Sequence, residues 1–137
     1  MSEPAEIISE IEKILCPRQD LAGLKVLVTA GATREKLDPV RFLTNHSSGK
    51  MGFALAEAAR DRGAEVTLVK GFTTAETPQR VRTVTVESTE DLLDVMVRET
   101  PSQDIVIQAA APADYKPAAV SETKIKKQAG QEMVQIG

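Results

Sequence analysis

The chain has 137 residues, of which 42% are hydrophobic, so it is long enough for one domain with a single core. Its formal net charge of -3 and sequence pI of about 5.3 argue against a surface for DNA or RNA, which needs clustered lysine and arginine. Aromatic residues make up only 3% of the chain. Stacking platforms for single-stranded nucleic acid are therefore not expected either.

Targeting signals are also missing from the sequence. It contains no run of about 18 apolar residues, so we expect no membrane-spanning helix. Acidic residues stand near the N-terminus, where a secretory signal carries positive charges. The single cysteine, Cys16, has no second cysteine with which to form a disulfide. These features lead us to expect a cytoplasmic protein.

The first predicted element is a short helix that ends before Pro17. Its apolar residues fall on one face, and they are Ile7, Ile8, Ile11, Ile14 and Leu15. The stretch 16–23 contains a proline, a glycine and several polar residues, which is typical of a linker. We place the boundary near residue 20, with the helix and linker over 1–20 and the main domain over 21–137.

The main domain begins with a predicted β-α-β unit. A buried strand is expected at 25–29, a helix from about Lys50 to Arg62 after a long loop, and a second strand at 65–69. Gly63 is expected to cap the helix. An apolar stripe with helical spacing should cover the sheet, and its residues are Met51, Ala54, Leu55 and Ala58.

The pattern of strands and helices then continues. Valine alternates with polar residues over 80–87, which predicts a strand with one wetter face. Ser88 and Asp91 have the spacing of a capping box, so a helix is expected over about 90–99, and Pro101 ends it. A further apolar strand is predicted at 104–109. Strands separated by amphipathic helices indicate an α/β fold, Rossmann-like and doubly wound, with a mainly parallel sheet.

Two conspicuous loops, 31–52 and 110–116, follow strands of this sheet. Ligands of doubly wound sheets bind outside the carboxyl ends of the strands. Both loops should therefore lie at the same edge, where they can share one pocket.

The segment TNHSSGKMG at 44–52 runs directly into the predicted helix. The first amides of a helix have no internal acceptor and lie at the positive end of its dipole, so they attract phosphate or carboxylate. Gly49 and Gly52 would let such a ligand approach closely. We favour a phosphate site here over an ordinary helix cap.

Two better-known phosphate motifs do not match. A Walker A loop would need glycine at Thr44 and serine or threonine at Met51. A dinucleotide fingerprint would need further glycines directly after Gly31, and about eighteen residues intervene before the helix. Nicotinamide cofactor chemistry is therefore disfavoured.

Arg41 and Asn45 lie in a loop that Pro39 stiffens. Arginine can hold a carboxylate or phosphate with two hydrogen bonds, and a fixed asparagine amide can hold an oxyanion. The spacing does not decide between two roles for Arg41. It could bind such an anion, or it could form an ion pair with Asp38 or Glu35 on a solvated loop.

The later loop AAPADYKP offers small residues at 109–111 against which a ligand could lie, and Asp114 as an acceptor; the alternative is a plain loop. The lysines at 124, 126 and 127 could neutralise a triphosphate, although such charge runs are more often solvated surface. His46 is the only histidine, and no cysteine or acidic cluster has ligand spacing. We predict no metal ligands in the protein, and Mg²⁺ would have to arrive with a nucleotide.

Together these segments resemble one known family, the phosphopantothenate-cysteine ligase domain of coenzyme A biosynthesis. The resemblance rests on VTAGATRE, DPVRFLTNHSSGKMGFALAEAA, AAPADY and KIKKQ, which occur in the family's order and at similar spacing. It covers the chain from about Leu21 to its end. The first 20 residues resemble the segment that joins the decarboxylase and ligase halves of the bifunctional bacterial protein.

The resemblance implies a two-step ligation. The carboxylate of 4'-phosphopantothenate attacks the α-phosphate of CTP, which gives an acyl-cytidylate and pyrophosphate, and the amine of L-cysteine then displaces CMP. It also implies Mg²⁺ with the nucleotide, a homodimer, and the decarboxylase half as a further partner.

The family's functional positions can be carried over residue by residue. Its nucleotide-binding positions fall on Gly31, Ser47, Gly49, Gly52, Asp114 and Lys124. Its substrate-binding positions fall on Asn45, Ala110, Ala111, Asp114 and Arg41. Catalysis is implied for Asn45, which holds the substrate, for Lys124, which offsets charge at the α-phosphate, and for Arg41, which reaches into the neighbouring subunit's site.

The sequence departs from the family in two ways. Pro112 stands where a small aliphatic residue is usual, and family members continue well beyond Gly137. The chain thus resembles the N-terminal part of the domain, and we expect it to bind nucleotide poorly and turn over little or nothing by itself. Two alternatives are a non-catalytic module that binds a phosphometabolite or nucleotide, and a short NAD(P)-binding Rossmann oxidoreductase.

Overall fold

The computed structural model describes residues 4–8 and 19–126. Residues 4–8 are helical, as expected for the start of the N-terminal helix, and they are exposed. The rest of that helix, with Cys16 and Pro17, lies outside the described residues, as does Lys127. No helix in the described ranges is long and apolar enough to span a membrane.

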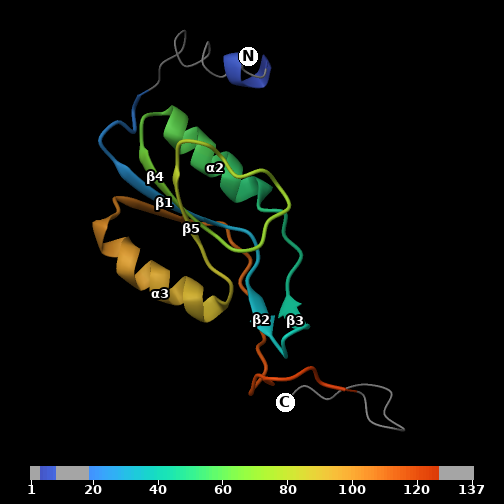
Figure 1. The fold of residues 1–137 in the computed structure, drawn as a ribbon. Helices are drawn as coiled ribbons and strands as arrows, with labels where there is room; N and C mark the ends of the chain where they lie inside the picture. Colours follow the sequence, from blue (N-terminus) through green and yellow to red (C-terminus); the bar gives the residue numbers. More distant parts are fainter. Residues whose placement is uncertain (1–3, 9–18, 127–137) are drawn as a thin grey trace.

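A parallel sheet of four strands forms the centre of the protein, in the order β5-β4-β1-β6 (Figure 1). The strands are β1 (Lys25–Ala30), β4 (Glu65–Lys70), β5 (Arg82–Thr85) and β6 (Ile105–Gln108). Strand β1 pairs in parallel with both β4 and β6, so that Val26 lies opposite Val66 and Ile105. This arrangement confirms the predicted Rossmann-like α/β fold.

Two helices cover opposite faces of the sheet (Figure 1). Helix α2 (Lys50–Asp61) packs Phe53 with Val26 and Val28 on one face. Helix α3 (Thr89–Glu99) packs Val95 with Leu27 on the other face. Alternate residues of β1 thus enter different cores, as the two-residue period of a strand requires.

The prediction for the buried face of α2 is wrong. Its four predicted residues are all exposed, with Met51 at 73% and Leu55 at 36%. The face that packs on the sheet consists instead of Gly52, Phe53, Ala56 and Ala59. A Cβ atom at Gly52 would lie 2.4 Å from the Ala30 Cβ, so the close approach at this glycine sets the rotation of the helix.

The ends of the helices agree with the sequence signals. Gly63 follows the C-terminus of α2 with φ of 95°, and Ser88 and Asp91 form the capping box of α3. A short 3₁₀ helix, η1 (Thr100–Ser102), contains Pro101 and ends α3. The third predicted strand is shorter than expected, because only Arg82–Thr85 of the segment 80–87 pairs with β4.

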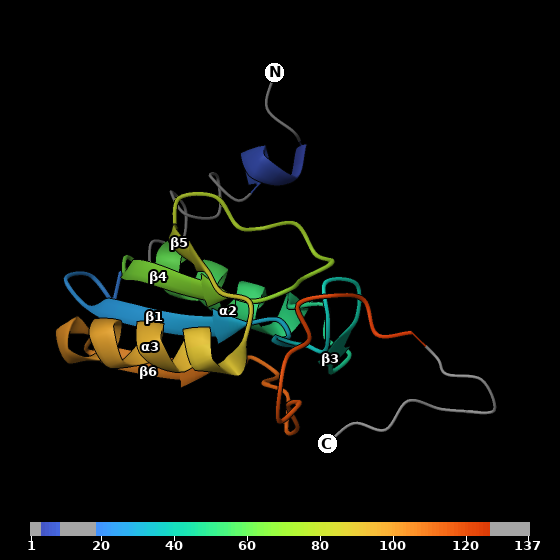
Figure 2. The ribbon, with the colours of Figure 1, turned by 60° about the horizontal axis from the view of Figure 1, so that its bottom comes forward.

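The long loop after β1 contains an antiparallel hairpin that was not predicted. It consists of β2 (Arg34–Lys36) and β3 (Phe42–Thr44), which extend beyond the carboxyl end of the sheet (Figure 2). Glu35 connects the hairpin to α3, because its carboxylate accepts from the Thr89 amide at 2.7 Å. Strands of three residues are too short to give an alternating apolar signal, so the sequence pattern missed them.

Candidate functional site

The loops that follow β1 and β6 lie side by side, as predicted. The Ala111 amide donates to the Gly31 carbonyl oxygen at 2.7 Å. The Thr29 hydroxyl accepts from the amides of Ala109 and Ala110 at 3.1 and 3.2 Å. The structure therefore brings one predicted nucleotide-binding glycine together with both predicted substrate-binding alanines.

The start of α2 completes this edge of the sheet. Gly49 is the N-cap residue and has φ of 83°, a left-handed conformation that glycine adopts without strain. Cβ atoms on Gly31 and Gly49 would lie 2.7 and 2.6 Å from the Thr73 methyl group. Larger side chains would not fit, so both ends of the loop after β1 pack closely against Thr73 in the segment after β4.

Part of this helix start remains available for an anion. The N-cap residue makes no side-chain capping bond, although the Lys50 amide donates to the Ser48 hydroxyl at 3.3 Å. The amides of Met51 and Gly52 have no acceptor within residues 4–8 and 19–126. Two unpaired amides at the positive end of a helix can bind phosphate. Ser47 lies half-buried two residues before the cap.

Asn45 joins the hairpin to the alanine-rich loop. Its side-chain Nδ2 donates to the Pro112 carbonyl oxygen at 2.9 Å, which places the residue beside the loop that carries Ala110 and Ala111. Asn45 remains exposed, as does Asp114. A ligand at this edge could therefore reach both side chains.

A second group of predicted residues gathers around the buried carboxylate of Asp38. Its Oδ1 accepts from the amides of Val40 and Arg41 at 2.8 and 2.7 Å. Its Oδ2 accepts from the Ile125 amide at 2.8 Å and from Arg41 Nη1 at 3.1 Å. Arg41 Nη1 also donates to the Ile125 carbonyl oxygen at 2.6 Å. Both polar groups of Ile125 are thus held next to Lys124.

These hydrogen bonds have an electrostatic consequence. The Ile125 amide, together with the amides of Val40 and Arg41 and the charge of Arg41, lowers the pKa of Asp38 below its ordinary value, while burial acts in the opposite direction. The carboxylate is therefore ionised at neutral pH and keeps its four donors. The sequence left Arg41 open between two roles, and the structure shows its ion pair with Asp38 while 46% of its side chain stays exposed.

The predicted site residues thus fall into two groups. Gly31, Gly49, Gly52, Asn45, Ala110 and Ala111 lie at the strand edge. Arg41 and Lys124 lie at the hairpin turn, and no hydrogen bond in the described ranges joins them to Asn45. Within those ranges, no group of three histidine, cysteine or acidic residues could hold a metal ion.

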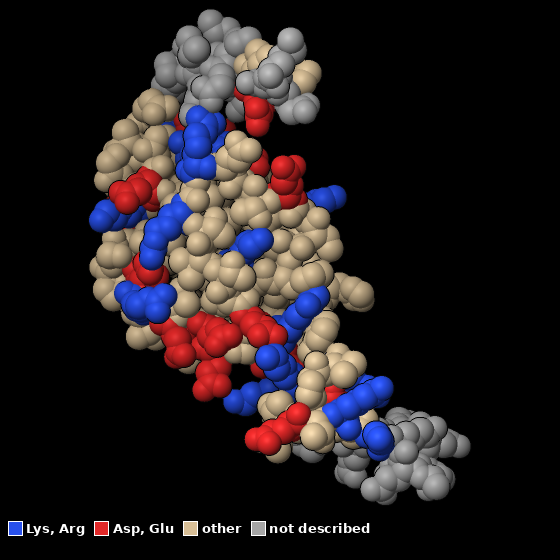
Figure 3. Space-filling view, in the orientation of Figure 1, with Lys and Arg blue, Asp and Glu red and all other residues tan. Residues whose placement is uncertain are grey.

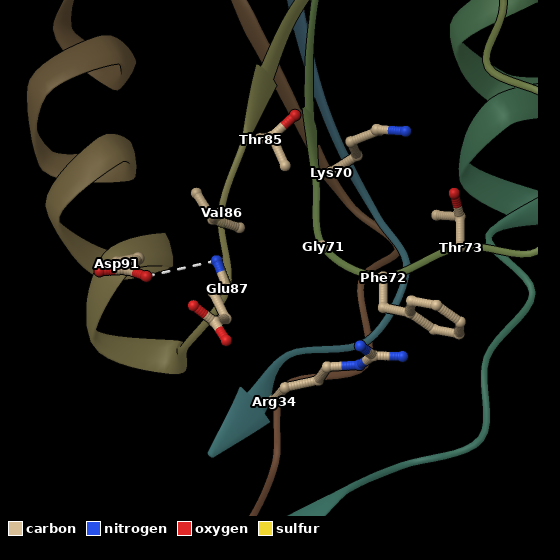
Figure 4. A pocket seen from close by; sticks show the side chains of 9 residues that line it. All are labelled: Arg34, Lys70, Gly71, Phe72, Thr73, Thr85, Val86, Glu87 and Asp91. Atoms are coloured by element: carbon tan, nitrogen blue, oxygen red, sulfur yellow. Dashed lines mark hydrogen bonds between the residues drawn. The ribbon is translucent and has the colours of Figure 1, made fainter. Parts of the chain in front are cut away.

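Sequence reasoning missed a cavity of about 520 Å³ next to the glycine turn (Figure 4). We call it the Arg34 cavity; it lies where β4 and β5 end, and its lining includes Arg34, Lys70, Phe72, Thr73, Glu87 and Asp91. Its residues come from three segments far apart in the chain, so no local motif could have announced it.

Comparison with known proteins identifies a family for the chain. The family described as the DNA/pantothenate metabolism flavoprotein C-terminal domain matches residues 21–136. The chain belongs to this family.

Its relatives are proteins of coenzyme A biosynthesis. The chain is 50% identical over 127 residues to the coenzyme A biosynthesis bifunctional protein CoaBC of Vibrio cholerae, a match that covers 93% of the chain and 32% of that protein. The CoaBC protein of Mycobacterium tuberculosis is 47% identical over 129 residues, which cover 90% of the chain and 31% of that protein. The chain thus spans about a third of these relatives.

Two solved structures share the fold. The crystal structure of the C-terminal domain of CoaBC has a TM-score of 0.71 and 49% identity, and the match covers 79% of the chain and 57% of that structure. The DNA/pantothenate metabolism flavoprotein of Streptococcus pneumoniae has a TM-score of 0.66 and 34% identity, with 69% and 42% covered.

Proposed function

We propose that this chain forms part of a CTP-dependent phosphopantothenate-cysteine ligase of coenzyme A biosynthesis. The observation that carries the proposal is the meeting of the unpaired α2 amides, Gly31 and the alanine-rich loop at one strand edge. Membership of the family and the names of its relatives agree with it.

In the first step, a carboxylate oxygen of 4'-phosphopantothenate attacks the α-phosphorus of CTP. The phosphorus–oxygen bond to pyrophosphate breaks as the acyl-cytidylate forms. We assign the nucleotide phosphates to the start of α2, with Ser47, Gly49 and Gly52, because amides at a helix start stabilise anionic oxygens without being ionised themselves.

In the second step, the amine of L-cysteine attacks the acyl carbon. The carbon–oxygen bond to CMP breaks, and the amine loses its proton. Asn45 stands beside Pro112, from where its amide could steady the acyl oxygen as negative charge develops. Ala110 and Ala111 would support the substrate, and Asp114 would accept a hydrogen bond from it.

The hairpin turn would supply positive charge. We assign to Lys124 the neutralisation of charge at the α-phosphate. The neighbouring residue Ile125 is held by two hydrogen bonds, since its amide donates to Asp38 and its carbonyl oxygen accepts from Arg41. A Mg²⁺ ion bound to the nucleotide would supply further charge neutralisation. Among the described residues, no acidic cluster could hold this ion.

We also propose that the protein acts as a homodimer in which Arg41 reaches the partner's substrate. About half of its side chain is exposed beyond the Asp38 pair, which leaves guanidinium surface for a second contact. Light scattering after gel filtration would test the dimer, and a monomer at assay concentration would contradict it.

Pyrophosphate release tests the ligase. The assay contains CTP, phosphopantothenate and cysteine, and is run on this chain and on a full-length relative with matching substitutions. Asn45→Asp and Lys124→Gln should each reduce turnover by about 100-fold or more. Glu122→Gln, an exposed neighbour of Lys124, serves as the control and should leave turnover unchanged.

The same measurements separate the alternatives. Full activity in Asn45→Asp would contradict the proposed mechanism. Binding of a phosphate ligand without pyrophosphate release in the full-length protein would favour a non-catalytic module. Calorimetric binding of NADPH without binding of CTP would favour an oxidoreductase.

A further inference from the structure

The Arg34 cavity holds two cations that have no carboxylate partner among the described residues. Arg34 makes no ion pair or side-chain hydrogen bond within residues 4–8 and 19–126, and its Nε is buried without an acceptor. Lys70 lines the same cavity, and its ammonium group donates at 2.9 Å to the neutral hydroxyl of Thr77. A buried charged donor without an acceptor is costly, so an anion beside Arg34 would relieve that cost.

The nearby acids do not supply that anion, because each has another partner. Glu35 accepts from the Thr89 amide at 2.7 Å. Glu87 lies 3.6 Å from the Lys36 ammonium group. Asp91 belongs to the capping box of α3 and accepts from the Ser88 amide at 3.1 Å. None of these carboxylates forms an ion pair with Arg34 within the described ranges.

Aromatic rings fix the guanidinium in place. The Arg34 Cζ lies 4.3 Å from the ring centroid of Phe42 and 3.7 Å from that of Phe72. Figure 4 shows the guanidinium against the Phe72 ring at one end of the cavity, with Lys70 beyond it. A guanidinium held between rings keeps its planar fork of donors in one orientation, which suits an oxyanion that can take two hydrogen bonds.

The cavity adjoins the proposed nucleotide site. Thr73 lines the cavity, and its methyl group is the atom that side chains at Gly31 and Gly49 would meet. The lining also includes the Thr85 residue at the end of β5. Ligands of open α/β sheets bind at this edge, so one extended ligand could occupy both places.

We infer that the Arg34 cavity binds a phosphate group of a substrate, with Arg34 as its main ligand and Lys70 as the second cation. The inference rests on the proposed function only for the identity of the substrate. Two substrates of the proposed reaction carry such a group, namely CTP and 4'-phosphopantothenate. The chemistry is the same for both, and the experiment separates them.

Isothermal titration calorimetry tests the inference on this chain with CTP and with phosphopantothenate. Arg34→Met keeps a side chain that packs on the rings but removes the charge. It should weaken the binding of one of the two ligands by about tenfold or more. Cytidine and pantothenate, which lack the phosphate, should show no dependence on Arg34.

Two further variants control for the loss of any positive charge and for misfolding of Arg34→Met. Arg98→Met removes an exposed cation of α3 outside the cavity, with 64% of its side chain accessible, and should leave both affinities unchanged. Lys70→Met removes the second cation, and it should weaken the same ligand if Arg34→Met fails to fold. Circular dichroism would show whether each variant is folded.

Equal affinities in the wild type and in folded Arg34→Met, or no binding of either phosphate ligand by the wild type, would overturn the inference. Its failure is distinguishable from that of the ligase. Arg34-dependent binding without pyrophosphate release by the full-length relative would support phosphate binding in the Arg34 cavity and contradict the ligase. Pyrophosphate release that depends on Asn45 but not on Arg34 would support the ligase and contradict phosphate binding in the Arg34 cavity.

Discussion

The sheet with its helices and the hairpin with its neighbouring loop are stabilised in different ways. In the first region, apolar side chains such as Leu27 and Leu68 are fully buried, and glycines bring backbones into contact. In the second region, four hydrogen bonds converge on the carboxylate of Asp38. Figure 3 shows the same contrast, since charged side chains gather toward the hairpin end of this face.

The difference teaches that the two groups of candidate site residues depend on different forces. The strand edge should respond to changes in side-chain size, because its loops touch through backbone. The hairpin turn should respond to changes in charge and pH, because it is held by an ionised group. Substitutions in each region can test that division.

At the strand edge, the largest effect is expected for Gly52→Ala. The new Cβ would lie 2.4 Å from the Ala30 Cβ and 2.9 Å from the Thr29 carbonyl oxygen, so α2 must move away from β1. We expect a loss of about 2–3 kcal/mol in the free energy of unfolding, measured in urea. Ala54→Ser on the exposed face of the same helix should change it by less than about 0.5 kcal/mol.

Asp38→Asn should release the segment that carries Lys124. The introduced side-chain amide can keep its oxygen toward the backbone amides of Val40 and Arg41. Its nitrogen, which is itself a donor, then faces two further donors, the Ile125 amide and Arg41 Nη1. Trypsin should then cleave after Lys124 about ten times faster. Unchanged cleavage in Asp38→Asn, or equal acceleration in the control Glu122→Gln, would show that the carboxylate does not hold the segment.

Acid should reproduce this release. The folded pKa of Asp38 lies below its ordinary value of 3.8, so the unfolded chain binds the proton more readily. The stabilising contribution is complete above that value and is lost as the pH falls through the folded pKa. The difference in unfolding free energy between the wild type and Asp38→Asn should therefore shrink below about pH 4. A constant difference would contradict the assignment.

A smaller effect is expected at the start of α3. Ser88→Ala removes the hydroxyl that accepts from the Asp91 amide at 3.0 Å, and it should cost about 1 kcal/mol. Ser88→Asp restores an acceptor and should recover most of the loss. Thermal unfolding followed by circular dichroism would measure the stability of both variants. Unchanged stability in Ser88→Ala would show that the capping box of α3 contributes nothing to the free energy of unfolding.

The smallest effect is expected on the outer face of α2. Met51→Gln alters a side chain that is 73% exposed and should change stability by less than about 0.5 kcal/mol. Phe53→Ala on the buried face should cost about 3–5 kcal/mol. A large loss in Met51→Gln, measured by urea unfolding, would mean that another surface covers this face.

Much of the fold was predictable because its signals are local. The apolar run at β1, the capping box at Ser88 and the glycine after α2 each lie within a few residues of the element that they define. The buried face of α2 was not predictable from spacing. Alanines occur on both sides of the helix, so two stripes had similar hydrophobicity, and the close contact of Gly52 with β1 selected one.

The sequence by itself determined the succession of the four sheet strands and two helices of the main domain, and the residues that resemble the ligase family, because periodicity and motifs are written along the chain. Only the tertiary structure decided that Asp38 is the buried centre of the hairpin turn and that Arg34 and Lys70 share a cavity. The physical reason is that ion pairs and cavities depend on where distant segments meet, and their energies depend on burial.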